Sequence, residues 1–379
     1  MILESGHGPV DGTHYLRATP ESVGWGRLPC RTTKPGLTIE SGDTVTFDTI
    51  SHEGILEDQG RDPVAFFRQF GIAATEVLSD ARLLARTPPP RDPDADGPHV
   101  ATAPVRVRGA EPGDLLKAEV LSLHRRADYG VISSRHGRGA LPDEFAREGP
   151  EFTFCTVERE ASRDVGVIPY GDGRSARFPL HPFMGVMGVS TDTDHGEHTV
   201  PPGRHGGNID MKDLTSGSAL YLPVQTEGAG FYTGDPHYAQ GNGEVALTAM
   251  EAPLRATFRL TVLKGSRARA AASALRQPFG ETDRYWIPFG LHEDLNLAMR
   301  AAVRAAVDFL ADRFGMARTT AYAYLSAAAD FEISQVVDQV QGVHRLIRKA
   351  DFREADFRES GVRESGVRES GIREADIRA

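Results

Sequence analysis

The sequence predicts a mainly β fold of sandwich or barrel type, followed by a small helical appendage and a short repetitive tail. Glycine and proline recur at short intervals up to about residue 265, and several short stretches alternate apolar with polar residues. This pattern is typical of strands with one buried and one wetter face. From about residue 291 the apolar period becomes helical, and residues 350–379 repeat every five positions. We therefore predict a β-sandwich body at 1–290, a helical appendage at 291–349 and a tail at 350–379.

Three alternating stretches carry the strand prediction, and one segment interrupts them. Apolar residues occupy every second position at Val45 and Phe47, at Val105 and Val107, and from Ala256 to Val262. Residues 62–86 instead follow helical spacing, and the proline-rich stretch after Thr87 must end that helix in an exposed loop.

Three amphipathic helices are predicted near the C-terminal end. The first places Met299, Val303, Val307, Leu310 and Phe314 on one face and ends near Gly315, because glycine favours helix termini. The second covers Ala321–Ala329. The third has apolar residues at helical spacing from Ile333 to Val340 and ends at Gly342.

The tail divides into pentads that read ADFRE, ADFRE, SGVRE, SGVRE, SGIRE and ADIRA. A period of five builds no face on an α-helix, because the apolar residue rotates by about 140° per repeat. The pattern resembles the pentapeptide-repeat family, in which the chain winds into a square β-helix. Six pentads make only a short solenoid, so either a flexible tail or a short coil docked on the body is possible.

Composition excludes several classes of function. The net charge of −10 argues against a general affinity for nucleic acid or for an anionic membrane, since both need a basic surface. The two cysteines, Cys30 and Cys155, cannot form a disulfide framework or a thiolate zinc site alone. The N-terminus lacks the basic start and apolar core of a secretory signal, and no run is apolar enough for a membrane helix, so we expect a cytoplasmic protein.

Gly203–Glu244 is the segment most suggestive of chemistry. It places polar residues beside glycines at both ends of an apolar run, Leu220–Val224, that looks like a strand. These polar residues are Asn208, Asp210, Asp213, Asp235, His237 and Glu244. Oxygen and imidazole groups on glycine-permitted turns can converge on a divalent metal ion. Asp235 and His237 lie two apart and would face one side of an extended strand. The competing interpretation is a loop whose Asp and His cap turns.

Two further segments offer supporting groups. His52 and Glu53 follow the strand at Val45 and Phe47, so His52 could bind a metal and Glu53 could activate water as a general base. The stretch Ser133–Gly139, which includes His136, could bind an anion or a developing oxyanion. A solvated surface is the alternative for both segments. No Gly-x-Ser-x-Gly elbow and no Gly-x-x-x-x-Gly-Lys-[Ser/Thr] loop is present, which argues against a serine nucleophile and a nucleotide site.

Several motifs in order resemble the acetamidase/formamidase family of amide hydrolases. They are GPHVATAPVRVRGAEPGDLLKAEVLSL at 97–123, FMGVMGV at 183–189, PPGRHGGNIDMKDLTSGSALYLPV at 201–224 and GAGFYTGDPHYAQGNGEV at 228–245. SHEGILEDQGRDP at 51–63 and SRHGRGALP at 134–142 resemble one branch of the family. The resemblance runs from about residue 10 to about 349 and leaves out the pentads.

The resemblance implies a β-sandwich body, which we expect to be jelly-roll-like, a homo-oligomer of two or more chains, and hydrolysis of short amides to carboxylate and ammonia. It also implies a divalent metal, for which zinc is the first choice and calcium the second. The positions that match family motifs are Asn208, Asp210, Asp235, His237 and Glu244.

We therefore predict a metal-assisted amidase for small linear amides. The expected metal ligands are His52, Asp210, Asp235 and His237, and the expected catalytic residues are Glu53, Glu244 and Asn208. His136 and Phe231 are the expected substrate contacts. A hydrolase of cyclic amides, with the same site and a wider mouth, is the first alternative. A scaffold that binds a small amide without turnover is the second.

Overall fold

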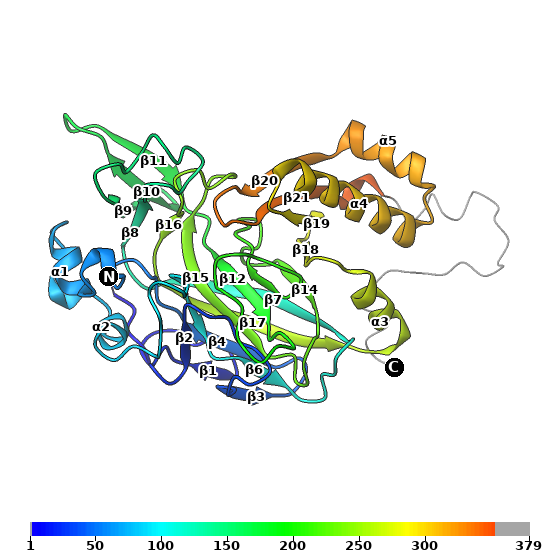
Figure 1. The fold of residues 1–379 in the computed structure, drawn as a ribbon, viewed down its shortest axis with the longest axis horizontal. Helices are drawn as coiled ribbons and strands as arrows, with labels where there is room; N and C mark the ends of the chain where they lie inside the picture. The colour runs from blue at the N-terminus through cyan, green and yellow to red at the C-terminus, as the bar shows by residue number, and fades with distance from the viewer. Residues whose placement is uncertain (1, 353–379) are drawn as a thin grey trace.

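The chain folds into two large β-sheets with a few helices at their edges. The structure, a computed structural model, describes residues 2–352 (Figure 1). Within that range the strands form a nine-stranded and a twelve-stranded sheet. The predicted mainly β class is confirmed.

The nine-stranded sheet has the order β1-β4-β17-β7-β14-β18-β19-β21-β20. Its strands are β1 (His14–Leu16), β4 (Thr44–Asp48), β7 (Leu115–Arg125), β14 (Ala219–Pro223), β17 (Leu254–Leu263), β18 (Phe279–Glu281), β19 (Tyr285–His292), β20 (Asp330–Gln335) and β21 (Gln341–Arg348). The predicted strands at 45–47, 220–224 and 256–262 appear here as β4, β14 and β17.

The twelve-stranded sheet has a main path of β11-β10-β9-β8-β16-β15-β12-β13, with β5 and β6 also pairing with β15, β2 with β5 and β3 with β6. Its strands are β2 (Val23–Trp25), β3 (Leu37–Ile39), β5 (Val100–Thr102), β6 (Val105–Val107), β8 (Tyr129–Ser134), β9 (Glu151–Glu160), β10 (Arg163–Pro169), β11 (Ser175–Pro179), β12 (Phe183–Val189), β13 (Gly206–Asn208), β15 (Phe231–Ala239) and β16 (Met250–Glu251). Strands β9 to β11 extend from the body as an arm (Figure 1).

The main core lies where the inner faces of the two sheets meet. Phe47 of β4 and Phe258 of β17 pack against Phe231 of β15, with ring centroids 6.1 and 5.1 Å from Phe231. Every residue of β12 is buried. Strand β15 pairs antiparallel with β12 and is buried at every residue but the last, so the polar residues that β15 carries are buried as well.

Short helices occupy the predicted helical segment near residues 62–86. It contains α1 (Pro63–Arg68), the 3₁₀ turn η2 (Ala74–Glu76) and α2 (Ser79–Arg86), with a second 3₁₀ turn, η1 (Glu57–Gln59), just before them. Asp62 caps α1 by accepting from the backbone N–H groups of Val64 and Ala65. The predicted helical interruption is therefore confirmed, as two short helices rather than one continuous helix.

Two helices pack on the far end of the nine-stranded sheet (Figure 1). They are α4 (Leu295–Phe314) and α5 (Arg318–Ala328), while α3 (Gly265–Ala274) follows β17 and η3 (Lys349–Asp351) ends the described chain. Gly315 ends α4 in the left-handed conformation at φ 64°, as predicted. The buried face of α4 includes Ala298, Ala302 and Ala306 rather than Met299, because small side chains let the helix approach Gly290 of β19 closely.

The predicted third helix is wrong, because residues 330–348 form β20 and β21. The two strands pair antiparallel with each other, and β21 also pairs with β19. The apolar spacing from Ile333 to Val340 fits a helix by period alone, but the valines and isoleucine are β-branched and favour strands. The segment 291–349 thus adds two strands to the sheet as well as two helices.

Part of the polar face of β4 and β17, around Asp48 and Arg255, is covered rather than solvent-exposed. The Arg255 guanidinium donates to both oxygens of Asp48, at 2.6 and 3.1 Å, and to backbone carbonyls of the N-terminal segment, including those of Glu4 and Pro9. Both side chains are completely buried. Burial alone raises the pKa of Asp48, but the bonds from Arg255 and the charge of Arg126 lower it below its usual value. The predicted wetter face is therefore covered at the Arg255 end of β17, while Arg259 on the same face is exposed as predicted.

Replacing Arg255 by Met is expected to lower the free energy of unfolding by about 3–5 kcal/mol, because it leaves the Asp48 carboxylate buried without its main partner. Arg108→Met is the matched control: Arg108 pairs with Glu40 at 3.0 Å, but its side chain is 65% exposed. We expect that control to change stability by less than about 1 kcal/mol. Urea unfolding of both variants measures the difference, and equal losses would contradict the assignment.

Residues 353–379, which hold nearly all the pentads, lie outside the described residues. Among the helices described, none has the length and apolar character needed to cross a membrane.

Candidate metal and catalytic site

Buried carboxyl and imidazole groups gather at the edge of β15 and in the loops around it. The cluster consists of His52, Glu53, His99, Asp210, Asp235, His237, Glu244, Glu251 and Asp338. These residues come from the loop after β4, the position just before β5, the loop after β13, β15 and its following loop, β16, and the β20–β21 connection. All nine are at most 7% exposed.

Asp235 lies in the middle of this cluster. Its Oδ1 is 3.3 Å from His52 Nδ1, and its Oδ2 is 2.9 Å from His237 Nε2 and 3.9 Å from His99 Nε2. The predicted convergence of Asp235 and His237 on one side of the strand is thus what the structure shows. One carboxylate faces three imidazoles.

His237 connects Asp235 to the second half of the cluster. Its Nε2 is 3.0 Å from Glu251 Oε1, and its Nδ1 is 3.8 Å from Asp210 Oδ1 and 3.1 Å from Gln240 Oε1. Gln240 in turn donates to the carbonyl of Asp210 at 2.9 Å, which ties the loop after β13 to the end of β15. The two polar ends of the segment Gly203–Glu244 therefore fold back together.

Three of the carboxylates sit on strained backbone. Asp210, Asp235 and Glu244 have φ values of 43°, 50° and 46°, in the left-handed region that non-glycine residues avoid. Each such residue costs about 1–3 kcal/mol, and strain of this kind is kept where it serves a site. The backbone geometry therefore points to a functional reason for aiming these side chains inward.

Gly185 of β12 forms the floor beneath these groups. A Cβ there would lie 2.5 Å from Asp210 Oδ1, 2.7 Å from Asp235 Oδ2 and 2.8 Å from His237 Cε1. The Gly185 carbonyl accepts from the N–H groups of Ile209 and Asp210, at 3.0 and 3.3 Å. Only glycine lets the strand approach the cluster this closely.

Glu53 holds His52 rather than facing open space. Its Oε1 is 3.4 Å from His52 Nε2 and accepts from Ser133 Oγ at 2.7 Å, while Oε2 accepts from the Gln59 amide. A carboxylate on the outer nitrogen of a histidine fixes the tautomer that leaves the inner nitrogen free. His52 Nδ1, which faces Asp235, has no hydrogen-bond partner.

The donor set fits a divalent metal ion. Buried atoms without hydrogen-bond partners include His52 Nδ1, His99 Nδ1, Asp210 Oδ1, Asp235 Oδ1, Glu244 Oε2 and Glu251 Oε2. Ligand atoms lie within 4.8 Å of one another in the sets His52–His99–Asp235, Asp235–His237–Glu251 and Asp210–His237–Glu244. Atoms bound tetrahedrally at about 2.0–2.1 Å stand about 3.3 Å apart, close to the His52–Asp235 distance. Nitrogen and oxygen donors of this kind suit zinc or a similar ion.

The buried carboxylates of the cluster favour positive charge on the groups beside them. Burial lowers the pKa of His52 by itself, but its contacts with Asp235 and Glu53 raise that pKa to about 10. His237 also has a raised pKa, because Glu251 and Asp235 outweigh burial. His99 is the exception: burial and the neighbouring imidazoles lower its pKa to about 4. A cation bound here would therefore displace protons from the imidazoles.

Several carboxyls of the cluster have raised pKa values, because they are buried and lie near other carboxylates. Burial and neighbouring carboxylates raise the pKa of Asp210 to about 6 and that of Glu251 to about 7. The pKa values of Glu244 and Asp338 are raised well above the usual range by burial and by Asp210. Asp235 has a lowered pKa, because the imidazoles that face it overcome its burial. So many buried acids are costly unless protons or a cation neutralise them.

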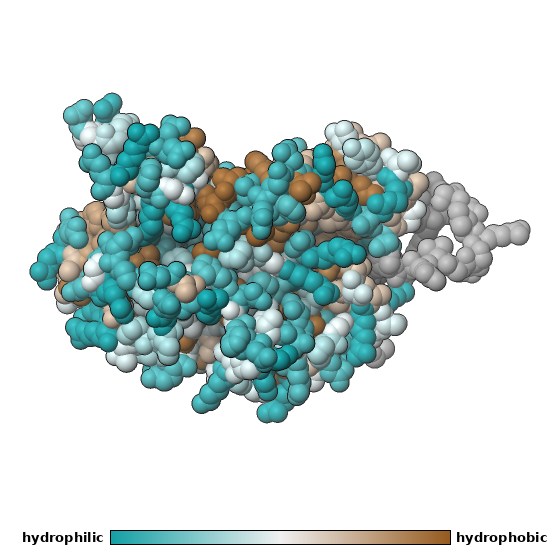
Figure 2. All heavy atoms as spheres, in the orientation of Figure 1, coloured by the Kyte–Doolittle hydropathy of each residue, from teal (hydrophilic) through white to brown (hydrophobic). Residues whose placement is uncertain are grey.

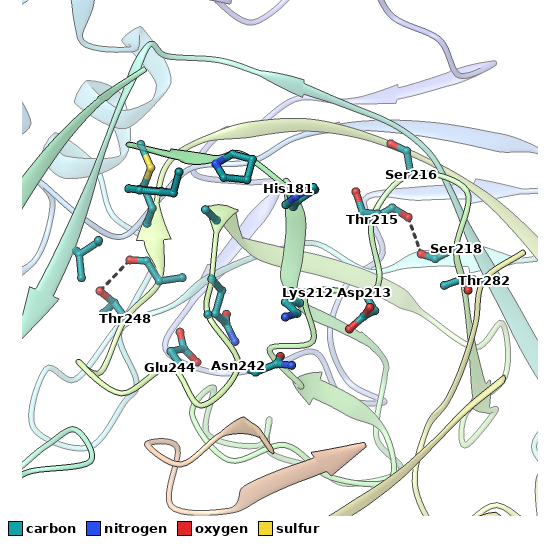
Figure 3. Close-up of a pocket in the computed structure, with 18 of the residues that line it drawn as sticks. His181, Lys212, Asp213, Thr215, Ser216, Ser218, Asn242, Glu244, Thr248 and Thr282 are labelled. Atoms are coloured by element: carbon teal, nitrogen blue, oxygen red, sulfur yellow. Dashed lines mark hydrogen bonds between the residues drawn. The ribbon is translucent and has the colours of Figure 1, made fainter. Parts of the chain in front are cut away.

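A cavity of about 850 Å³ opens beside the cluster (Figure 3). Glu244 and Gln240 line it, so these cluster neighbours face the space that a substrate would enter. Its wall is mostly apolar, with Ile132, Ile168, Phe178, Met250 and Tyr285 among its residues. Lys212, Asp213 and Asn242 form a polar stretch near Glu244 (Figure 3).

Two predicted site residues, Phe231 and His136, lie apart from the cluster. Phe231 is fully buried in the main core between Phe47 and Phe258, four residues before Asp235. His136 is exposed, and its Nδ1 contacts the carbonyl of Phe145 at 3.3 Å. Asn208 is buried on β13 opposite Val186. The structure thus brings His52, Glu53, Asp210, Asp235, His237 and Glu244 together and does not place Phe231 or His136 with them.

The sequence patterns did not predict three residues of the cluster, which are His99, Glu251 and Asp338. His99 directly precedes β5 within a segment that resembles the family, so its position carried a usable signal. Asp338 was assigned to a helix, and Glu251 sits on a strand of two residues. Gln335 shapes the Asp338 loop by accepting from the N–H groups of Val337 and Asp338. Such loop geometry has no local sequence signature.

The Acetamidase/Formamidase family model matches residues 189–347. A formamidase of Methylophilus methylotrophus is 26% identical over 307 residues, which is 65% of this chain and 75% of that protein. An acetamidase of Mycolicibacterium smegmatis is 27% identical over 41% of this chain, which spans about half (51%) of that protein's length. The crystal structure of an acetamidase from Bacillus halodurans is 26% identical, with a TM-score of 0.68 over 92% of this chain and 100% of that one.

Proposed function

We propose that the chain is a member of the acetamidase/formamidase family and hydrolyses the C–N bond of small linear amides to a carboxylate and ammonia, with a bound metal ion assisting water attack. The observation that carries this proposal is the cluster of buried, partly unpartnered His, Asp and Glu side chains beside a cavity. The names of the similar proteins, formamidase and acetamidase, indicate the substrate class.

We propose His52, His99, Asp235 and His237 as the metal ligands. The first three form one set of converging ligand atoms, and Asp235 and His237 form a second set with Glu251, beside Asp210. A divalent ion held there would polarise an amide carbonyl and lower the pKa of a bound water toward about 7. Zinc is the ion we expect, because imidazole and carboxylate together suit it.

Glu244 is the group we propose for proton transfer. It is the cluster carboxyl that lines the cavity, and its Oε2 has no hydrogen-bond partner. A carboxyl placed there can take a proton from the attacking water and pass it to the leaving nitrogen. Both oxygens of Glu53 are already occupied by donors, so its proposed role changes from general base to positioning of His52.

The size of the cavity favours one second candidate. A space of about 850 Å³ is far larger than formamide and lies in the range of sites for drug-sized ligands. A cyclic amide would fit the same site through this wide, mostly apolar mouth. A cytoplasmic location and a homo-oligomer remain predictions.

The test is ammonia release from formamide, acetamide and propionamide, before and after chelation and with Zn²⁺ added back. We expect activity on at least one linear amide, loss on chelation and recovery with zinc. An amine assay with a simple lactam runs in parallel, because ring opening yields an amino acid and no ammonia. Amine formation without ammonia release would favour the cyclic-amide hydrolase. A folded protein that turns over neither would favour a non-catalytic amide-binding scaffold.

A further inference from the structure

A second group of potential ligands lies beside the cavity, separate from the cluster around Asp235. It consists of Asp213 in the loop after β13, Glu332 on β20 and His344 on β21. His344 Nε2 is 3.5 Å from Asp213 Oδ2 and 3.9 Å from Glu332 Oε2. None of the three belongs to the sets of ligand atoms around Asp235 and His237.

The His344 ring independently indicates that a ligand binds at this group of residues. Its side chain is completely buried, yet Nε2 has no hydrogen-bond partner, and neither has the facing Asp213 Oδ2. The 3.5 Å between these two atoms is longer than the usual 2.7–3.2 Å of an N–H···O bond. It is close to the ~3.3 Å that separates two atoms bound tetrahedrally to one ion.

The other ring nitrogen of His344 contacts a hydroxyl group. His344 Nδ1 is 2.7 Å from Ser334 Oγ, on β20. When Nδ1–H donates to that hydroxyl, Nε2 carries a lone pair that points toward a carboxylate oxygen. Two electron-rich atoms facing each other in a buried site repel unless a cation lies between them, and an outer hydrogen bond of this kind orients metal-binding histidines.

The surrounding contacts hold the three side chains in place. The Asn242 amide donates to Glu332 Oε2, and Gly243 N–H donates to the carbonyl of Ser334 at 3.0 Å. Asp213 and Asn242 both line the cavity, so water in the cavity can complete the coordination of an ion (Figure 3). Burial raises the pKa of Asp213, but the contact with His344 and the charge of the neighbouring Lys212 lower that pKa overall.

We propose that Asp213, Glu332 and His344 form a second divalent-metal site, which takes a zinc-like ion and ties the loop after β13 to the β20–β21 pair. One imidazole nitrogen and carboxylate oxygens are the donors, and the remaining positions belong to water on the cavity side. The proposal does not depend on amidase activity.

The experiment is to count bound zinc per chain by elemental analysis after dialysis of the full-length protein against buffered Zn²⁺. We expect His344→Gln and Asp213→Asn each to hold one zinc fewer than the wild type. The exposed His195→Gln, as matched control, should keep the wild-type number. Asp235→Asn should lose zinc from the other site and keep this ion, which distinguishes the two sites.

Glu332→Gln serves if the buried substitutions prevent folding, because Glu332 is half-exposed. We expect the affinity of the Glu332→Gln protein for this zinc ion to fall at least about 10-fold, which is the smallest loss usual when a partner outside the ligands themselves is mutated. Cobalt substitution gives a second readout: visible absorption of the protein-bound cobalt should decrease in His344→Gln. Unchanged zinc content and affinity in folded His344→Gln or Glu332→Gln would overturn the proposal.

Discussion

Replacing Asp235 by Asn is expected to abolish ammonia release and to weaken metal binding by more than about 100-fold. Loss of an outer-shell partner alone costs about 10- to 100-fold in metal affinity, and Asp235 stands closer to the proposed ion than any outer partner. Its two oxygens face His52 and His237 at 3.3 and 2.9 Å. An amide has nearly the shape of the carboxylate but no charge, so it cannot neutralise an ion between these imidazoles.

The measurements are ammonia release and zinc content per chain, with circular dichroism to show that the variant is folded. Asp192→Asn is the matched control, because Asp192 is an exposed carboxylate paired only at the surface with Arg31. That control should keep wild-type activity and zinc content. Full activity in an Asp235→Asn protein of normal zinc content would show that Asp235 does not hold a catalytic metal.

The strands and the site residues on β15 were predictable, because the sequence patterns that indicate them are local. Val45 and Phe47 alternate over a short strand, and Asp235 and His237 stand two apart on an extended one, so period two alone places each pair on one face. The glycines of Gly203–Glu244 marked the turns that bring Asp210 and Glu244 back toward them. The helix from Leu295 was equally visible, since it runs for 20 residues and ends at Gly315.

The remaining errors come from tertiary context. The period of Ile333, Val336 and Val337 fits a helix, yet pairing of β20 with β21 decides for strands. Asp338 then reaches the cluster through a loop held by Gln335, which no spacing rule predicts. Phe231 stands four residues before Asp235, so strict period two would place both side chains on one face. Asp235 departs from extended backbone at φ 50°, and the Phe231 ring packs in the core between the sheets.

Gly185→Ala is expected to remove metal binding and activity although it adds a single methyl group. The new Cβ would stand 2.5 Å from Asp210 Oδ1 and 2.7 Å from Asp235 Oδ2, distances at which atoms must shift. Its neighbours have little freedom to give way, because β12 is buried along its whole length and the Gly185 carbonyl already accepts from Ile209 and Asp210. Overpacking a core in this way costs about 1–3 kcal/mol of stability, so we expect a folded protein.

Gly24→Ala is the matched control, since Gly24 also lies in a strand and its Cβ would meet only the Arg27 carbonyl, at 3.4 Å. Zinc content per chain, ammonia release and urea unfolding are measured for both variants. If Gly185→Ala loses zinc and activity while Gly24→Ala keeps both, the close approach of β12 is what shapes the cradle for the ion. If Gly185→Ala keeps its zinc and its activity, the carboxylates of Asp210 and Asp235 have room to move away from the added methyl group. Metal binding would then depend more on the imidazoles than on the close approach of Gly185.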